Sequence, residues 1–116
     1  MNRHVLFLGH IPRSIDKIRA YTSGIDQRDF MKQSVLQDAV IRQLEIIGEA
    51  VKNVSAGSKA RRPSIRWKDI AGMRDRLIHG YFGVDLEAVW ITVQKDVHLL
   101  QQEVESLLEE LTSAED

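Results

Sequence analysis

Apolar side chains recur along this chain at intervals of three and four residues, which places them on one face of an α-helix. No segment alternates between apolar and polar residues with a period of two, so the pattern predicts no strand. The spacing predicts four helices, over about residues 4–22, 31–54, 67–81 and 86–111. The four apolar stripes are Leu8, Ile11, Ile15, Ile18 and Thr22 or Tyr21; Leu36, Val40, Leu44, Ile47, Val51 and Val54; Ile70, Met73, Leu77 and Tyr81; and Leu86, Trp90, Val93, Val97, Leu100, Val104, Leu107 and Leu111.

Glycine, proline and capping residues indicate where these helices begin and end. Gly24 ends the first helix. Pro12 leaves two possibilities for its start, because proline suits a first turn but kinks a helix interior: the helix begins near Pro12, or near His4 with a bend. Residues 25–30 are expected to form a linker or one short turn. Residues 55–58 are predicted to end the second helix, and Gly80 and Gly83 mark the end of the third. Asp85 is the expected N-cap of the fourth helix, and residues 112–116 are expected to fray.

Four amphipathic helices joined by short loops predict an all-α protein, an up-down four-helix bundle with short connecting helices. The length of 116 residues is that of a single domain, 1–116. A domain of this size leaves much apolar surface exposed, so we expect it to dimerise. The chain has no cysteine, which excludes disulfides, thiolate nucleophiles and zinc–thiolate sites. It shows no membrane-spanning run and no secretory signal, so we expect a cytoplasmic protein.

The charges are distributed unevenly, although the net charge is only −1. Residues 59–76 carry seven basic and two acidic side chains, whereas residues 85–116 carry nine acidic side chains and one lysine. The first segment can therefore form a basic patch that holds phosphates. The alternative is a solvated loop next to a solvated helix face, which charge alone favours.

The candidate chemistry lies in the segment RDRLIHGY, which begins at Arg74 and ends at Tyr81. His79 falls in the last turn of its predicted helix, where the helix dipole favours the imidazolium, and Asp75 one turn earlier acts in the same direction. Such a histidine can act as an acid or a base near neutral pH. Arg74 presents a planar fork for a phosphate, Arg76 adds another cation, and Tyr81 offers a hydroxyl or a stacking ring.

An arginine and a histidine in basic surroundings suit phosphodiester cleavage without a metal. The histidine would take the proton of a ribose 2′-hydroxyl, and the arginine would hold the phosphate as charge builds, so the substrate would be RNA. Arg74 and His79 are five residues apart, about 140° around a helix, and do not converge on one unbroken helix. Arg74 and His79 would converge if the helix loosens at Gly80, or if a second copy of the chain brings its own pair alongside.

Structural roles explain the same residues without any chemistry. A histidine before a glycine is a common helix end, Arg74 can simply pair with Asp75 or Glu49, and Tyr81 falls on the apolar stripe. Glu45 and Glu49, one turn apart, are more often a solvated face than an acid–base pair. The chain has no Glu-x-x-His pattern, so we expect no metal site. Trp67 lies between Arg66 and Lys68, where it either stacks on a base or plugs the end of the bundle.

The string RDRLIHGYFGVD resembles the R-x4-H-x-Y motif of the HEPN superfamily. QDAVIRQLEIIGEAVKNVS and IRWKDIAGMRDRLIHGYFGVDLEAVW resemble its HepT-like branch, the toxin of HepT/MntA-type toxin–antitoxin pairs. The resemblance covers about residues 37–111 and is most specific over residues 69–90. It is weak before Gly24, where Pro12 departs from the family's uninterrupted first helix.

The resemblance implies a metal-independent endoribonuclease toxin without a cofactor, acting on RNA as a homodimer or higher oligomer whose paired motifs face a cleft. It implies Arg74 and His79 as catalytic residues and Tyr81 as the residue to which a nucleotidyltransferase-fold antitoxin adds AMP. Asp75 matches the polar residue that often follows the motif arginine, and Glu45 and Glu49 resemble polar positions near the family's cleft.

Two rival hypotheses remain beside the ribonuclease. The bundle can be a catalytically silent binding module or partner subunit of a nucleotidyltransferase, or a purely structural dimerisation bundle. The latter predicts that Arg74→Ala and His79→Ala change stability alone. If Asp75 raises the pKa of His79, Asp75→Asn should move the acidic limb of an activity profile to lower pH.

Overall fold

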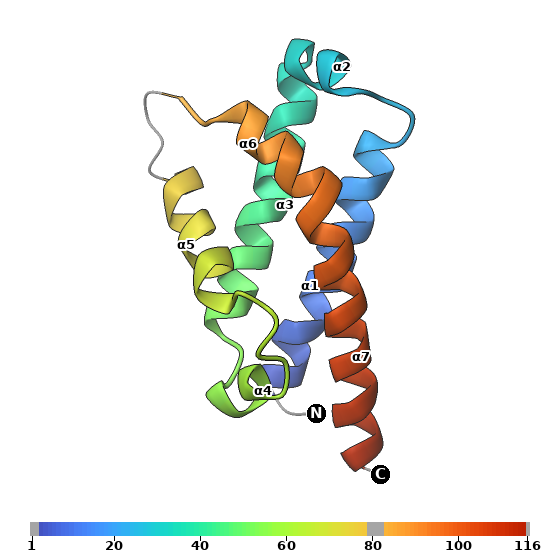
Figure 1. Cartoon of the computed structure of the whole chain (residues 1–116), viewed down its shortest axis with the longest axis vertical. Helices are drawn as coiled ribbons and strands as arrows, with labels where there is room; N and C mark the ends of the chain where they lie inside the picture. The colour runs from blue at the N-terminus through green and yellow to red at the C-terminus, as the bar shows by residue number, and fades with distance from the viewer. Residues whose placement is uncertain (1–2, 79–82, 116) are drawn as a thin grey trace.

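The computed structural model describes residues 3–78 and 83–115, and the regular secondary structure of these residues is entirely helical (Figure 1). The elements are α1 (Arg3–Thr22), α2 (Gln27–Lys32), α3 (Ser34–Lys52), α4 (Ala56–Ala60), α5 (Trp67–Ile78), α6 (Leu86–Ile91), the π-helical turn η1 (Thr92–Asp96) and α7 (Val97–Glu115). The predicted all-α class is therefore confirmed. No helix in these two ranges is long and apolar enough to cross a membrane.

The long helices run alternately up and down the longest axis of the molecule (Figure 1). The short helix α2 lies at one end of the bundle and α4 at the other. Helix α3 is the centre of the packing, because it contacts both α1 and α5 extensively, and α7 completes the bundle against α1. Helix α5 therefore depends mainly on α3 for its position.

The predicted apolar stripes form the core. Every stripe residue of α1 from Leu8 to Ile18 is fully buried, and so are the central members of the stripes of α3 and α7. Trp90, predicted to be core, is buried as well. The stripe of α5 is the exception, because Ile70, Met73 and Leu77 are only partly buried and pack on the edge of the core.

The ends of the first predicted helix lie where the sequence indicated. Helix α1 begins at Arg3 and continues through Pro12, which is the second of the two possibilities. Gly24 follows its end with φ of +76°, a left-handed conformation that glycine adopts without a steric penalty. Asp85 caps α6 as predicted, because its side chain accepts the backbone N–H of Ala88 at 3.1 Å.

The helix predicted over residues 31–54 is two helices. Gln33 adopts an extended conformation and separates α2 from α3. Residues 25–30, expected to form a linker or one short turn, include the start of the short helix α2, because Asp26 and Asp29 form a reciprocal capping box. This turn places Phe30 in the core, where its ring lies 5.2 Å from that of Trp90.

The helix predicted over residues 86–111 is longer and less regular than expected. It passes through the π-helical turn η1 and remains helical to Glu115, in the part expected to fray. The second predicted helix ends at Lys52, and Ser55, expected only to stop it, caps α4 by accepting the backbone N–H of Ser58 at 3.2 Å. Helix α4 thus includes residues 59 and 60, the start of the basic segment that was expected to be a loop.

Candidate active site

Arg74 stands where α5 lies tightly against Gly48 of α3. A Cβ atom built on Gly48 of α3 would overlap the Cβ of Arg74 and lie 3.2 Å from the backbone oxygen of Ile70. Only a glycine permits this approach, because any larger residue pushes α5 away. Gly48 therefore sets the position of the Arg74 backbone.

Two carboxylates hold the guanidinium of Arg74. Its Nε lies 3.0 Å from Oε2 of Glu49 on α3, and its Nη1 lies 3.1 Å from Oδ1 of Asp75. Lys52 Nζ binds the same Asp75 oxygen at 2.7 Å. The hydrogen bond from Lys52, and then that from Arg74, lowers the pKa of Asp75 below its ordinary value of 3.8. Asp75 is therefore ionised wherever the protein is folded near neutral pH.

The Nη2 group of Arg74 has no hydrogen-bond partner within residues 3–78 and 83–115. The side chain as a whole retains 29% of its exposure. An arginine fixed through Nε and Nη1, with Nη2 unpaired in these ranges, suits a phosphate oxygen, because the guanidinium is already oriented.

Arg74, Glu45 and Glu49 line one cavity of about 170 Å³. The structure thus brings together three of the residues that the sequence singled out. Glu45 and Glu49 are not a solvated face alone, since one binds Arg74 and both form the cavity wall.

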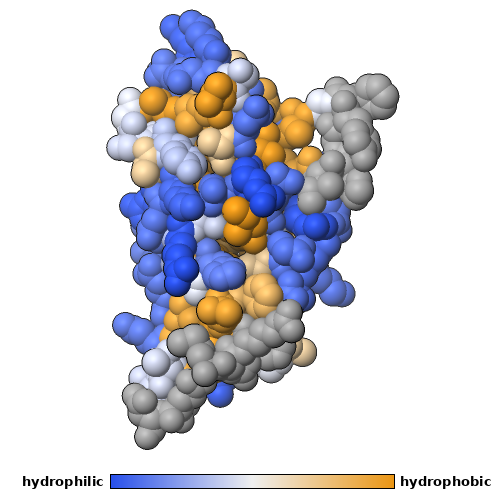
Figure 2. Space-filling view, turned by 180° about the vertical axis from the view of Figure 1, so that it is seen from behind, coloured by the Kyte–Doolittle hydropathy of each residue, from blue (hydrophilic) through white to orange (hydrophobic). Residues whose placement is uncertain are grey.

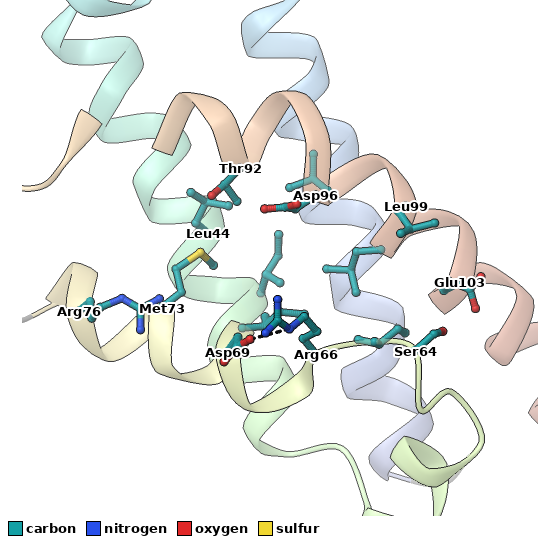
Figure 3. A pocket seen from close by; sticks show the side chains of 15 residues that line it. Leu44, Ser64, Arg66, Asp69, Met73, Arg76, Thr92, Asp96, Leu99 and Glu103 are labelled. Carbon is teal, nitrogen blue, oxygen red and sulfur yellow. Dashed lines mark ion pairs between the residues drawn. The ribbon is translucent and has the colours of Figure 1, made fainter. Parts of the chain in front are cut away.

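Arg76 lies on a different cavity, of about 440 Å³, on the other side of α5. Figure 3 shows Arg76 and Met73 reaching into it from α5, with Thr92 and Asp96 opposite them. Positions two apart on a helix point in nearly opposite directions, so Arg76 does not join Arg74. The mouth of this cavity also holds an ion pair between Arg66 and Asp69, at 2.9 Å (Figure 3).

His79, Gly80 and Tyr81 lie outside the described residues, so the proposed pair of Asp75 with His79 stays a prediction. So does the convergence of Arg74 with His79. Within the described ranges, no group of three or more histidine, aspartate and glutamate side chains is arranged to hold a metal ion.

Two arginines of the basic segment, for which charge alone favoured a solvated loop over a phosphate patch, pair with acidic residues of α7. Arg61 and Arg62 each bind Glu110 at 2.8 Å, and Arg62 also lies 3.6 Å from Glu103. The hydrogen bond from Arg62 lowers the pKa of Glu110, although partial desolvation opposes it, and Arg61 lowers it further. The uneven charges thus join two elements of the bundle, which favours the structural interpretation of this loop.

Trp67 plugs the end of the bundle and is not a stacking platform. It is buried, and its indole N–H donates to the backbone oxygens of Lys59 and Arg62 at 3.2 and 3.1 Å.

Helix α1 contributes to the site, although no pattern in the sequence pointed to it. Phe7 and His10 line the cavity of Arg74, together with Arg42 of α3. Figure 2 views the molecule from behind, and hydrophilic and apolar side chains are interspersed on that face. His10 is 64 residues from Arg74 in the chain, so local spacing carries no signal of their proximity.

Comparison with known proteins identifies the family. The model of the family described as "Ribonuclease HepT-like" matches residues 11–107. This chain belongs to the HepT-like family. The match includes Arg74, the charged residues that hold it, and helices α3 and α5, whereas Phe7 and His10 of α1 precede its first residue. It also covers the part of α1 that follows Pro12, so the departure at that position does not place the first helix outside the family.

Individual relatives agree with the family. The chain is 44% identical over 104 residues to "Probable ribonuclease HepT" of Thermococcus cleftensis, covering 90% of this chain and 94% of the relative. It is 46% identical over 106 residues to "Gamma-glutamylcyclotransferase and putative RNase" of Methanocaldococcus jannaschii, covering 91% of this chain. This chain spans 48% of the length of the latter relative. No solved structure matches.

Proposed function

We propose that this HepT-like chain is a metal-independent endoribonuclease and the toxin of a toxin–antitoxin pair. The observation that carries the proposal is the placement of Arg74, which lines a cavity and whose guanidinium is fixed by Glu49 and Asp75 through Nε and Nη1. Family membership and relatives named as ribonucleases support RNA as the substrate.

In the proposed reaction, His79 takes the proton of a ribose 2′-hydroxyl, and the 2′-oxygen attacks the adjacent phosphorus. The bond from phosphorus to the 5′-oxygen breaks, which leaves a 2′,3′-cyclic phosphate, and the departing 5′-oxygen takes a proton from water. Arg74 donates to the phosphate oxygens as negative charge builds in the transition state. Glu49 and Asp75 are positioning residues, because they orient the guanidinium without contacting the phosphate themselves.

The proposed active form is a homodimer. Two residues five apart, as Arg74 and His79 are, would point about 140° apart on an unbroken helix, and a second copy would supply the complementary residue across a cleft. The partly buried stripe of α5 is consistent with a helix that has a further partner. The mass of the protein in solution would show whether dimers associate further.

Control by an antitoxin completes the proposal. A nucleotidyltransferase-fold partner would add AMP to Tyr81, two residues after His79. The modification would add bulk and a negative phosphate beside the proposed cleft and would repel an incoming RNA phosphate. The expected result is that modified protein loses RNA cleavage while its fold is unchanged.

A second candidate function is a catalytically silent partner subunit of a nucleotidyltransferase. The ion pairs of Arg74 with Glu49 and Asp75 favour this function, because they give Nε and Nη1 of the guanidinium a partner without any substrate. In this case the cavity would have no RNA to bind, and Arg74 would serve packing alone.

The test is cleavage of several RNAs by purified, unmodified protein in the presence of EDTA. Wild type is compared with Arg74→Ala and His79→Ala, with circular dichroism as the control for folding. We expect a loss of about 10³-fold or more for each variant, typical of a catalytic group or an oxyanion donor. Cleavage that both variants retain would contradict the proposed mechanism. No cleavage by wild type, with Tyr81 unmodified by mass, would favour the silent subunit.

A further inference from the structure

The cavity beside Arg74 is built from three helices and extends well beyond the motif that the sequence indicated. It encloses about 170 Å³. Its walls include Phe7 and His10 of α1, Arg42, Glu45 and Glu49 of α3, and Arg74 of α5.

One wall of this cavity is aromatic. The rings of Phe7 and His10 meet edge to face, with centroids 5.7 Å apart and planes at 69°. Both side chains are partly buried, so the contact holds the imidazole in a defined orientation. Aromatic side chains, histidine included, are the surfaces on which unpaired RNA bases stack.

Helix α3 contributes a carboxylate to the cavity lining. Glu49 is bound to Arg74, whereas Glu45 is partly buried and has no ion pair or side-chain hydrogen bond within the described residues. A sheltered carboxylate without a donor is unfavourable, so it favours a ligand that presents N–H groups. Its two oxygens can accept two neighbouring N–H donors at once.

The four RNA bases differ in how they match such a carboxylate. Guanine presents two donors side by side, the ring N1–H and the exocyclic N2 amino group. Adenine and cytosine place their amino donor next to a ring nitrogen that accepts, and uracil flanks its single N–H with two carbonyl oxygens. A carboxylate therefore favours guanine and meets repulsion from the acceptors of the other three bases.

We propose that Glu45 and His10 form a subsite for a guanine base next to the scissile phosphate held by Arg74. Glu45 accepts from the Watson–Crick edge of guanine, and the base stacks against His10. Arg42, exposed at the rim, is placed to meet a flanking phosphate. The subsite rests on the proposed ribonuclease function, for which it supplies the sequence preference.

The test measures the binding of fluorescent 2′-O-methyl pentaribonucleotides, which cannot be cleaved because the 2′-oxygen is blocked. Uridine pentamers with guanine, inosine or adenine at the centre are compared by anisotropy. Wild type should bind the guanine pentamer about tenfold more tightly than the adenine pentamer. Inosine, which lacks the N2 amino group, should lose part of this advantage.

Two variants and two matched controls assign the preference to residues. Glu45→Gln should remove the difference between guanine and inosine, because the amide supplies one acceptor where the carboxylate supplied two. His10→Ala should weaken the binding of all three pentamers. Glu105→Gln and His98→Ala change the same residue types at exposed positions on α7 and should behave as wild type.

Equal binding of guanine and adenine pentamers, a guanine preference that survives Glu45→Gln, or no binding at all would overturn the subsite. Cleavage of natural RNA by the same proteins separates this failure from that of the ribonuclease. Cleavage without dependence on guanine or Glu45 overturns the subsite alone. A guanine preference that Glu45→Gln removes, without cleavage by wild type, supports the subsite and refutes the ribonuclease.

Discussion

Replacing Gly48 by alanine tests the close approach of α3 and α5 that positions Arg74. The added Cβ would overlap the Cβ of Arg74, and both atoms are attached directly to helix backbone. No side chain can rotate away, so α5 must shift relative to α3. Overpacking of this kind costs about 2–3 kcal/mol, and the better helix propensity of alanine returns about 1 kcal/mol.

The net destabilisation of Gly48→Ala is therefore about 1–2 kcal/mol. A chain of 116 residues has an unfolding entropy that converts 1 kcal/mol into about 4 °C of Tm. We expect Tm to fall by about 4–8 °C in thermal unfolding followed by circular dichroism. The same shift of α5 moves Arg74 away from Glu49, so RNA cleavage should fall at temperatures where the variant is still folded.

Gly57→Ala is the matched control. It makes the same chemical change in α4, where a Cβ has no neighbour within 4 Å. Its stability should stay unchanged or rise by up to about 1 kcal/mol. If Gly48→Ala is as stable as Gly57→Ala, α3 and α5 are not in the tight contact described, and the account of how Arg74 is positioned is wrong.

The remaining predictions concern the charges around the site and the end of the bundle. Because its pKa is lowered on folding, ionised Asp75 stabilises the protein above the unfolded pKa, and this contribution disappears as the pH falls through the folded pKa. Asp75→Asn should therefore be less stable than wild type in denaturant titrations at pH 6, and the difference should shrink and disappear as the pH falls through the lowered folded pKa of Asp75. In cleavage assays, Asp75→Asn should move the acidic limb of the pH–activity profile to lower pH. An acidic limb that does not move would show that Asp75 does not raise the pKa of His79. Trp67→Phe removes the indole donor to the oxygens of Lys59 and Arg62 and should cost about 1–2 kcal/mol; unchanged urea unfolding would contradict a structural role for those bonds.

Sequence spacing alone was enough to predict most of the core. Amphipathic stripes with long apolar residues bury one face whatever their partners are, because the driving force is the area removed from water. This holds for the stripes of α1, α3 and α7 and for Trp90. Local capping chemistry was equally readable at Gly24 and Asp85, since these signals depend on neighbours within four residues.

The breaks within helices were not readable from periodicity. Gln33 interrupts a stretch with helical spacing, and η1 widens the turn over residues 92–96 without a proline or glycine to mark it. The capping pair Asp26 and Asp29 is the signal that would have placed the start of α2. The interruption itself follows from packing, because it lets Phe30 enter the core against Trp90.

The spacing and chemistry of the residues were enough to predict the fold class, most of the core and Arg74 as the residue to follow. The surroundings of Arg74 depend on how the helices pack. Glu49 of α3 binds Arg74, His10 of α1 and Arg42 of α3 line the same cavity, and the glycine at position 48 allows the approach of α5. Such proximities arise from how helices pack against one another. Residues that meet across the bundle produce no periodic pattern in the sequence, so spacing does not predict them.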